Sequence, residues 1–174
     1  MLQDGYGRQI TYLRISVTDR CNMRCVYCMP PEGIPLQSHA AMLRYEEITA
    51  VVQAAASQGI REVRLTGGEP LVRLDLAELV RQIAAIPGIE DISLTTNGLL
   101  LGKYAQELAQ AGLRRVNVSL DTLRPDRFAP ITRGADLAQV WQGLAAADEA
   151  GLKPIKLNMV AMRGVNTDEI LDMA

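Results

Sequence analysis

The sequence predicts an α/β fold built on a curved parallel sheet, and two observations lead to this prediction. Apolar runs of strand length alternate with helical patterns along the chain, an order typical of βαβ units joined by right-handed crossovers. Within each strand, polar residues occupy every second position, so one face of the sheet is apolar and the other is polar. The 174 residues suit one domain, 1–174, with a substantial core.

Five strands and five helices are expected in alternation. The strands are predicted at Tyr12–Thr18, Glu62–Thr66, Asp91–Thr96, Arg114–Leu120 and Ile155–Ala161. The helices are predicted at Arg44–Gln58, from Asp75 to Ile86, at Lys103–Ala111, from Asp136 to Ala150, and from Asn166 or Thr167 onward. Aspartates that can cap a helix and glycines that can end one set most of these bounds. The segment with Pro125, Pro130 and Gly134 is expected to be a loop.

The polar face carries three cations, Arg14, Arg64 and Lys156. Unpaired buried cations cost several kcal/mol each, so these side chains must face water, internal carboxylates or a ligand anion. Two interpretations follow. Either the sheet is open and its helix-free face is solvated, or it is barrel-like and its polar interior holds an anionic substrate near the carboxyl ends of the strands.

Composition excludes several classes of protein. A hydrophobic content of 48% with 22% charged residues is that of an ordinary globular protein. The net charge of −2 gives no electrostatic case for nucleic acid or an anionic membrane. No apolar run approaches the ~18 residues of a membrane span, and the first fifteen residues lack a signal-peptide core. Together with reduced cysteines, this predicts a cytoplasmic protein.

The stretch from Cys21 to Cys28 contains all three cysteines of the chain. The odd count and tight spacing argue against a disulfide framework, and the polar neighbours of the cysteines argue against three inert core thiols. Three thiolates leave a four-iron cluster one ligand short, and an open iron can bind a substrate or cofactor directly. A zinc site is the alternative, but its fourth ligand could only be His39, the sole histidine.

The spacing Cys-x3-Cys-x2-Cys after a strand resembles the signature of the radical S-adenosylmethionine (SAM) enzymes. The longer string from Tyr12 to Pro30, YLRISVTDRCNMRCVYCMP, closely resembles the GTP 3',8-cyclase family of molybdenum cofactor biosynthesis within that group. The resemblance implies an incomplete (β/α) TIM-like barrel, a three-cysteine [4Fe–4S] cluster and bound SAM. It implies a lyase in which a 5'-deoxyadenosyl radical removes H3' of GTP and drives C3'–C8 closure to 3',8-cyclo-7,8-dihydro-GTP.

The resemblance also implies roles for individual residues, with no catalytic group beyond the cluster and cofactor. It implies that Cys21, Cys25 and Cys28 ligate the cluster, that Tyr27, Gly68, Glu69 and Ser119 contact SAM, and that Arg14, Arg64, Thr95 and Lys156 contact GTP. The three cations picked out by strand alternation are therefore the ones that the resemblance assigns to the anionic substrate. Asp121 either binds a ligand or only caps its loop.

Family members are about twice as long as this chain. They add a sixth strand and a C-terminal segment whose second [4Fe–4S] cluster binds the guanine, so we expect an N-terminal portion that is inactive alone. The resemblance implies an electron donor and a partner enzyme that makes cyclic pyranopterin monophosphate; the oligomeric state is left open, a homodimer being one option. Two alternatives are another radical SAM enzyme, such as a peptide-modifying one, and a non-enzymatic zinc-stabilised module.

Overall fold

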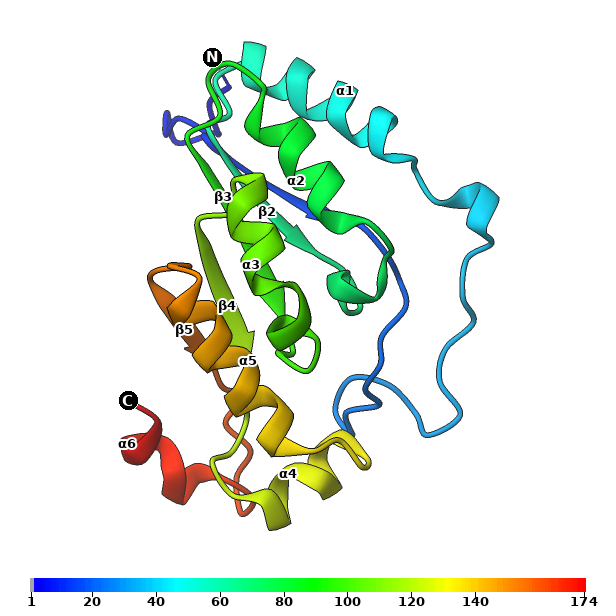
Figure 1. Cartoon of the computed structure of the whole chain (residues 1–174), viewed down its shortest axis with the longest axis vertical. Helices are drawn as coiled ribbons and strands as arrows, with labels where there is room; N and C mark the ends of the chain where they lie inside the picture. The colour runs from blue at the N-terminus through cyan, green and yellow to red at the C-terminus, as the bar shows by residue number, and fades with distance from the viewer. Residues whose placement is uncertain (1) are drawn as a thin grey trace.

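Five parallel strands form one sheet in the computed structural model, which describes residues 2–174 (Figure 1). The strands are β1 (Tyr12–Ser16), β2 (Glu62–Thr66), β3 (Asp91–Thr96), β4 (Arg115–Ser119) and β5 (Ile155–Asn158), and their order in the sheet is their order in the chain. Every strand pairs in parallel with the next. The predicted α/β class with a parallel sheet is confirmed.

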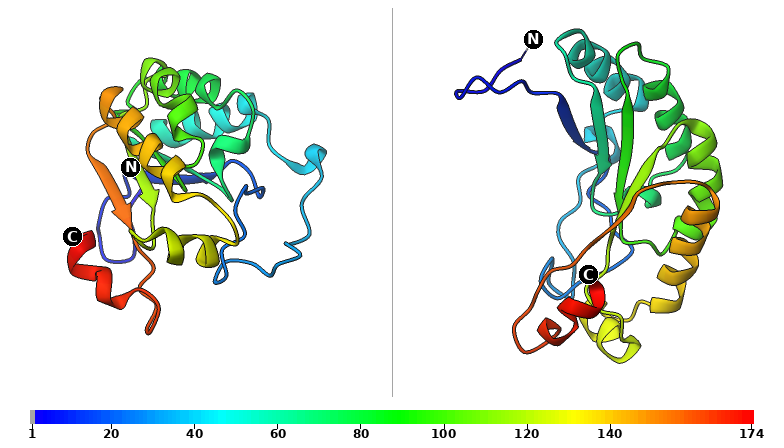
Figure 2. Two further views of the ribbon diagram at one scale, coloured as in Figure 1. Left: turned by 60° about the horizontal axis from the view of Figure 1, so that its bottom comes forward. Right: turned by 90° about the vertical axis from the view of Figure 1, so that its left-hand side faces the viewer.

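Helices connect the strands. The α-helices are α1 (Tyr45–Ser57), α2 (Leu76–Ala84), α3 (Leu101–Ala111), α4 (Pro125–Thr132), α5 (Leu137–Glu149) and α6 (Ile170–Met173), with short 3₁₀ turns at His39–Ala41, Pro70–Val72 and Thr167–Glu169. Figure 2 shows α1, α2, α3 and α5 on the same face of a curved sheet, while the opposite face is free of helices. No helix within residues 2–174 combines the length and apolar character that crossing a membrane requires.

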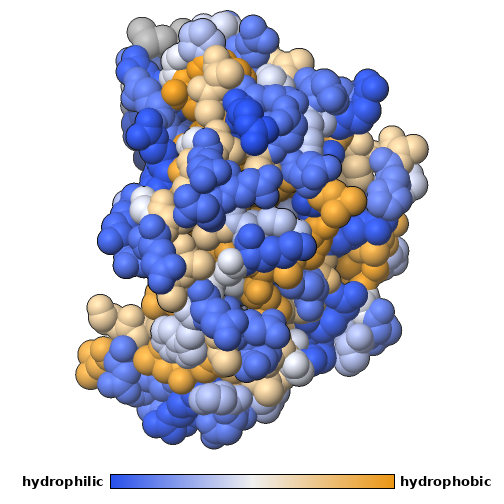
Figure 3. All heavy atoms as spheres, in the orientation of Figure 1, coloured by the Kyte–Doolittle hydropathy of each residue, from blue (hydrophilic) through white to orange (hydrophobic). Residues whose placement is uncertain are grey.

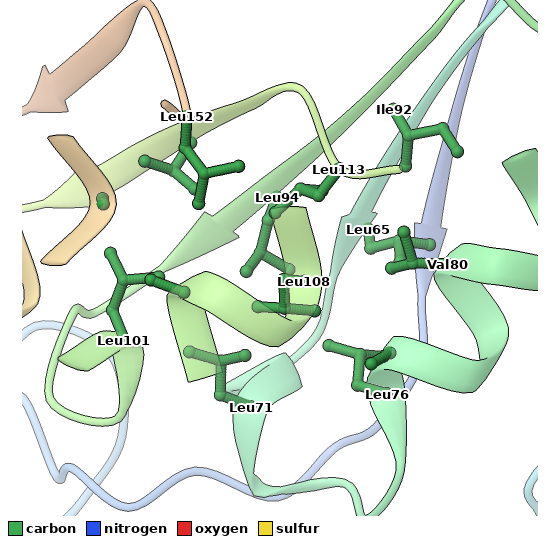
Figure 4. Packing of buried hydrophobic residues seen from close by; sticks show 14 of the residues in the cluster. Leu65, Leu71, Leu76, Val80, Ile92, Leu94, Leu101, Leu108, Leu113 and Leu152 are labelled. Atoms are coloured by element: carbon green, nitrogen blue, oxygen red, sulfur yellow. The ribbon is translucent and has the colours of Figure 1, made fainter. Parts of the chain in front are cut away.

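The core lies between the sheet and these helices, as the strand alternation predicts. Leu65 of β2 and Leu94 of β3 are fully buried, and they lie near Val80 of α2 and Leu108 of α3 (Figure 4). Removing such a side chain from water stabilises the fold by about 1.5–3 kcal/mol. The outer surfaces of the helices are mostly hydrophilic (Figure 3). This packing fixes which face of every strand is left for the polar residues.

The polar face has a defined register. Arg14 of β1 lies opposite Arg64 of β2, and Arg64 lies opposite Ser93 of β3. Nearer the carboxyl ends, Thr95 of β3 lies opposite Asn117 of β4, which in turn lies opposite Lys156 of β5. The three cations therefore share one face, as predicted.

The structure corrects several details of the predicted elements. The segment expected to be a loop contains α4, because Pro125 stands in the first turn of that helix, where a proline is compatible with helical geometry. Asp75 precedes α2 but has a left-handed backbone (φ 55°) and makes no side-chain cap. Asp136 does cap α5, accepting a hydrogen bond from the Ala138 N–H at 2.9 Å. β1 and β5 end two and three residues earlier than predicted.

Candidate functional site

A cavity of about 320 Å³ lies at the carboxyl ends of the strands. Residues from the cysteine segment, from the middle of β1 and from the carboxyl ends of the other four strands line it. Of the predicted site residues, the lining includes Arg14, Cys21, Cys25, Tyr27, Cys28, Gly68, Glu69, Thr95 and Ser119. Arg64 and Lys156 lie on the same sheet face but do not line this cavity. The structure thus brings together most of the side chains that the sequence singles out, and their individual roles stay predictions.

The three cysteines are free thiols in a short turn. Cys21 and Cys25 are half-buried against the core, whereas Cys28 is exposed. The turn is closed locally, because the N–H groups of Cys28 and Met29 both donate to the Cys25 carbonyl, at 2.9 and 3.2 Å. Burial, followed by the charge of Asp121, raises the pKa of Cys25 to about 11. Without a metal this thiol is therefore protonated at neutral pH, and binding of a cluster would release its proton.

The donor set fits an iron–sulfur cluster better than a single zinc ion. Three thiols from one turn line one cavity, and in a cubane each cysteine ligates a different iron, so the sulfurs need not converge on one point. Among residues 2–174, no three His, Cys, Asp or Glu side chains are arranged to hold one metal ion. His39 lines another pocket, whose lining includes none of the three cysteines. The zinc hypothesis, which needs His39 beside the cysteines, is not supported.

The Gly67-Gly68 turn after β2 packs directly on the segment that leads into the cysteines. The Gly68 N–H donates to the Thr18 carbonyl at 2.8 Å, and the Glu69 N–H donates to the Arg20 carbonyl at 2.7 Å. A Cβ at Gly68 would collide with the backbone oxygen of Arg20. Glycine is required at this position because the two backbones approach so closely, and their contact sets the position of the cysteine turn relative to the sheet.

The Glu69 carboxylate is buried, with 1% of the residue exposed. It accepts hydrogen bonds from the Thr96 hydroxyl at 2.8 Å, the Asn97 N–H at 2.7 Å and the Leu71 N–H at 3.1 Å. Burial raises the pKa of Glu69. The family resemblance implies that Glu69 contacts SAM. In the structure its hydrogen bonds join the turn after β2 to the turn after β3, so it holds the cavity wall in place.

Tyr27 and Asp121 join the cysteine turn to the end of β4. The Tyr27 hydroxyl donates to Asp121 Oδ2 at 2.6 Å, and the Val160 N–H donates to Asp121 Oδ1 at 2.9 Å. The buried Asn166 side chain donates to the Asp121 carbonyl at 2.7 Å. Burial and then the hydrogen bond to Asp121 raise the pKa of Tyr27. Asp121 therefore anchors the cysteine turn and the segment after β5.

Replacing Tyr27 by phenylalanine is expected to lower the free energy of unfolding by about 1–3 kcal/mol, because a buried carboxylate oxygen loses its donor. Denaturant unfolding of the metal-free protein measures this. Tyr6→Phe is the matched control, since Tyr6 is 88% exposed and lies outside the cavity. Equal stability of the two variants would contradict the proposed anchoring.

The three cations differ from a fourth cation on the same face. Arg115 is paired, with Nη2 lying 2.7 Å from Asp91 and 3.2 Å from Glu62. Within residues 2–174, Arg14, Arg64 and Lys156 form no salt bridge with a carboxylate. Like charges on paired strands repel, yet Arg14 lies directly opposite Arg64. Of the three partners that the sequence left open, carboxylates within residues 2–174 are therefore not the partners of these cations.

Comparison with known proteins places this arrangement in a family. The sequence matches the Radical SAM superfamily over residues 15–174. The chain belongs to the radical SAM superfamily. The structure is similar to those of HydG, a maturase of the [FeFe]-hydrogenase (TM-score 0.73, 15% identity, 94% of this chain and 38% of that one), and methylornithine synthase (TM-score 0.70, 18% identity, 88% and 45%). At this identity the likeness shows the fold alone, and the predicted partial radical SAM barrel is confirmed.

Closer relatives carry a more specific name. The chain is 62% identical over 173 residues to the GTP 3',8-cyclase of Pelotomaculum thermopropionicum and 59% identical over 173 residues to that of Moorella thermoacetica. These matches cover 99% of this radical SAM chain but 53% and 54% of the relatives. The chain thus spans about half the length of the curated relatives it matches. The resemblance to this cyclase family, predicted from residues 12–30, is confirmed.

The sequence did not reveal how α4 contributes to the site. The backbone of the cysteine turn is hydrogen-bonded to the end of α4, and the Arg133 side chain donates to two carbonyls of that turn. Arg133 lies more than 100 residues from its partners along the chain. The local sequence contains no signal for this contact, because its geometry depends on the folded sheet.

Proposed function

We propose that this chain forms the cluster-, SAM- and GTP-binding half of a GTP 3',8-cyclase, which makes 3',8-cyclo-7,8-dihydro-GTP in the first step of molybdenum cofactor biosynthesis. The observation that carries the proposal is the pairing of two features on one sheet. Three free cysteines line the cavity at its carboxyl end, and three cations without carboxylate partners share its polar face. The names of the similar proteins give the same reaction.

In this proposal Cys21, Cys25 and Cys28 hold a [4Fe–4S] cluster. Tyr27, Gly68 and Ser119 line the cavity beside them and would contact SAM. When bound, the reduced cluster and SAM would supply the radical chemistry: transfer of one electron would cleave SAM into methionine and a 5'-deoxyadenosyl radical, which would take a hydrogen atom from C3' of the ribose. The protein's own task is to hold GTP so that C3' faces this end of the cavity and to keep water away from it.

Arg14, Arg64 and Lys156 would bind the triphosphate. Arginine presents a planar fork that suits phosphate oxygens, and lysine contributes a point charge. Arg64 is partly held in place already, since its Nε donates to the Ser93 hydroxyl at 3.2 Å and its guanidinium lies over the Tyr12 ring at 5.3 Å. Thr95 lies on the cavity wall, nearer the cysteines. In this proposal the phosphates lie on the polar face of the sheet and the ribose faces the cluster. GTP would therefore bind in one orientation.

The proposal includes components outside these 174 residues. An electron donor reduces the cluster, and a second enzyme converts the product to cyclic pyranopterin monophosphate. The relatives are about twice as long as this chain, so a sixth strand and a segment with a second [4Fe–4S] cluster would complete the guanine site. We therefore expect little or no turnover from the 174-residue chain alone, and we place its reaction in the cytoplasm.

Nucleotide binding tests the substrate assignment. GTP is expected to bind the reconstituted protein at least about tenfold more tightly than guanosine monophosphate, because each charge-assisted phosphate contact contributes about 1.5–3 kcal/mol. Equilibrium dialysis under anaerobic conditions measures both affinities. Equal affinities would overturn the assignment of the cations to a triphosphate. They would favour another radical SAM reaction, such as peptide modification.

The reaction itself is tested with GTP deuterated at C3'. Any 5'-deoxyadenosine formed with this substrate is expected to carry deuterium, since the proposal takes the hydrogen from that carbon. Mass spectrometry detects the label even at a small number of turnovers. GTP-dependent 5'-deoxyadenosine without deuterium would contradict the proposed site of attack, and robust cyclisation by the 174-residue chain would contradict the need for the remaining half.

A further inference from the structure

The carboxyl end of α4 lies against the cysteine turn. The Val26 N–H donates to the Ile131 carbonyl at 2.9 Å, and the Arg24 N–H donates to the Thr132 carbonyl at 3.3 Å. The last carbonyls of a helix have no partner within it, and here the cysteine turn supplies two of the missing donors. Figure 1 shows the chain after α4 running beside the turn.

Arg133, the next residue after α4, extends this contact. Its Nη1 atom donates to the Arg24 carbonyl and to the Met29 carbonyl, both at 2.7 Å. Arg24 immediately precedes Cys25, and Met29 immediately follows Cys28. One nitrogen therefore joins the two ends of the segment that carries two of the three thiols. Cys21 lies outside the joined segment.

The backbone at Arg133 is left-handed, with φ 57° and ψ 53°. Glycine and asparagine adopt this conformation with less strain than arginine does. The helix end is fixed on either side, because the Thr132 hydroxyl donates to the Phe128 carbonyl at 2.7 Å and the Gly134 N–H donates to the Ala129 carbonyl at 2.8 Å. An arginine at this strained position indicates that its side chain makes hydrogen bonds that glycine or asparagine could not make.

We infer that Arg133 is a positioning residue for cluster binding: its guanidinium fixes the spacing between the two ends of segment 24–29 and so holds the Cys25 and Cys28 thiols at the cavity. The inference rests on the proposed ligation of the cluster by these cysteines. It goes beyond that proposal, because the three ligands alone do not require a contact from a residue distant in the sequence. Hydrogen bonds from residues that do not bind the metal often orient the ligands, and they commonly decide how tightly a site binds its metal.

The test uses thiol alkylation of the metal-free protein, followed by mass spectrometry at each cysteine. In Arg133→Gly the rate at Cys25 is expected to rise roughly tenfold, because local opening of the segment becomes easier. The rate at Cys21, which is half-buried like Cys25, should change by less than about twofold. Arg133→Lys should recover part of the protection, since one ammonium nitrogen can replace the single nitrogen that bridges the two carbonyls.

Arg133→Gly also separates the role of the side chain from the role of the left-handed backbone at the end of α4. Glycine adopts this backbone conformation without strain, so a residue that mattered only for the backbone conformation would be replaced without loss. Arg114→Ala, which replaces an exposed arginine just before β4, controls for loss of charge. Unchanged Cys25 alkylation in Arg133→Gly, or an equal rise at Cys21 and Cys25, would overturn the inference. Because neither SAM nor GTP is present, such a failure would leave the proposed reaction standing.

In the reconstituted protein the same variant is expected to lose its iron to a chelator roughly tenfold faster than wild type, with Arg133→Lys in between. Thermal unfolding of the metal-free protein should shift by no more than about 3 °C, which shows that the fold is intact. Faster iron loss from Arg114→Ala as well would show a general charge effect and contradict a specific role for Arg133.

Discussion

Replacing Cys25 by serine is expected to lower the bound iron and sulfide of the reconstituted protein by at least about tenfold. Loss of a partner outside the ligand set already costs a metal site 10–100-fold in affinity, and a direct ligand contributes more. Cys21→Ser and Cys28→Ser are expected to behave in the same way, because the chain has three cysteines and no histidine beside them to substitute. Iron analysis and visible absorption after anaerobic reconstitution measure the effect.

Met29→Leu is the matched control for the cysteine variants. It changes a sulfur-containing residue next to the turn and conserves the side-chain volume, and it keeps the backbone carbonyl that accepts from Arg133. Full iron content in any single cysteine variant would contradict the assignment of all three as ligands. A loss of iron in Met29→Leu equal to that in Cys25→Ser would show that the effect is not specific to the thiols.

Replacing Arg14 and Lys156 together by alanine is expected to weaken GTP binding by about 10²-fold or more. Each lost charge-assisted contact costs about 1.5–3 kcal/mol, and 1.4 kcal/mol corresponds to a factor of ten. Both residues are exposed, so the fold should tolerate the change. Equilibrium dialysis with GTP measures the loss, and guanosine monophosphate should be affected less because it makes fewer phosphate contacts.

Arg114 offers a control for this prediction, and Arg115 offers a contrast, because it is a paired cation on the same sheet face. Arg114→Ala removes one positive charge at the other end of the sheet and should leave GTP affinity within about twofold of wild type. Arg115→Ala removes the paired arginine of the polar face, so it should destabilise the fold by leaving Asp91 and Glu62 without their cation. GTP affinity that survives the Arg14/Lys156 double replacement would favour a different substrate.

Much of the fold could be predicted from the sequence because the strands follow a strict rule. In β2 and β3 the predicted bounds are those of the structure. Residues alternate between the core and the polar face, so a shift of one residue would bury Arg64 and expose Leu65. β5 was predicted three residues too long, because its pairing ends at Asn158, which lies opposite Ser119, the last residue of β4. Strand alternation identifies a strand more reliably than it identifies the end of one.

The candidate site was predictable where it depends on single residues and not where it depends on distant pairs. Strand alternation alone placed Arg14, Arg64 and Lys156 on one face, which the structure confirms, and the spacing of Cys21, Cys25 and Cys28 predicts a cluster turn, whose ligand role stays a prediction. Neither the hydrogen bond from Tyr27 to Asp121 nor those from Arg133 could be predicted, because the partners lie 94 to 109 residues apart. The two prolines in 125–132 also led to the prediction of a loop in place of α4, although Pro125 lies in the first turn, where a helix tolerates proline.

Electron paramagnetic resonance of the anaerobically reconstituted, reduced protein tests whether the three cysteines hold a cluster with one open iron. We expect a [4Fe–4S] signal whose g-values change when SAM is added, because the iron without a cysteine ligand is free to bind the cofactor. A protein without an iron–sulfur signal, or one whose signal is the same with and without SAM, would contradict it.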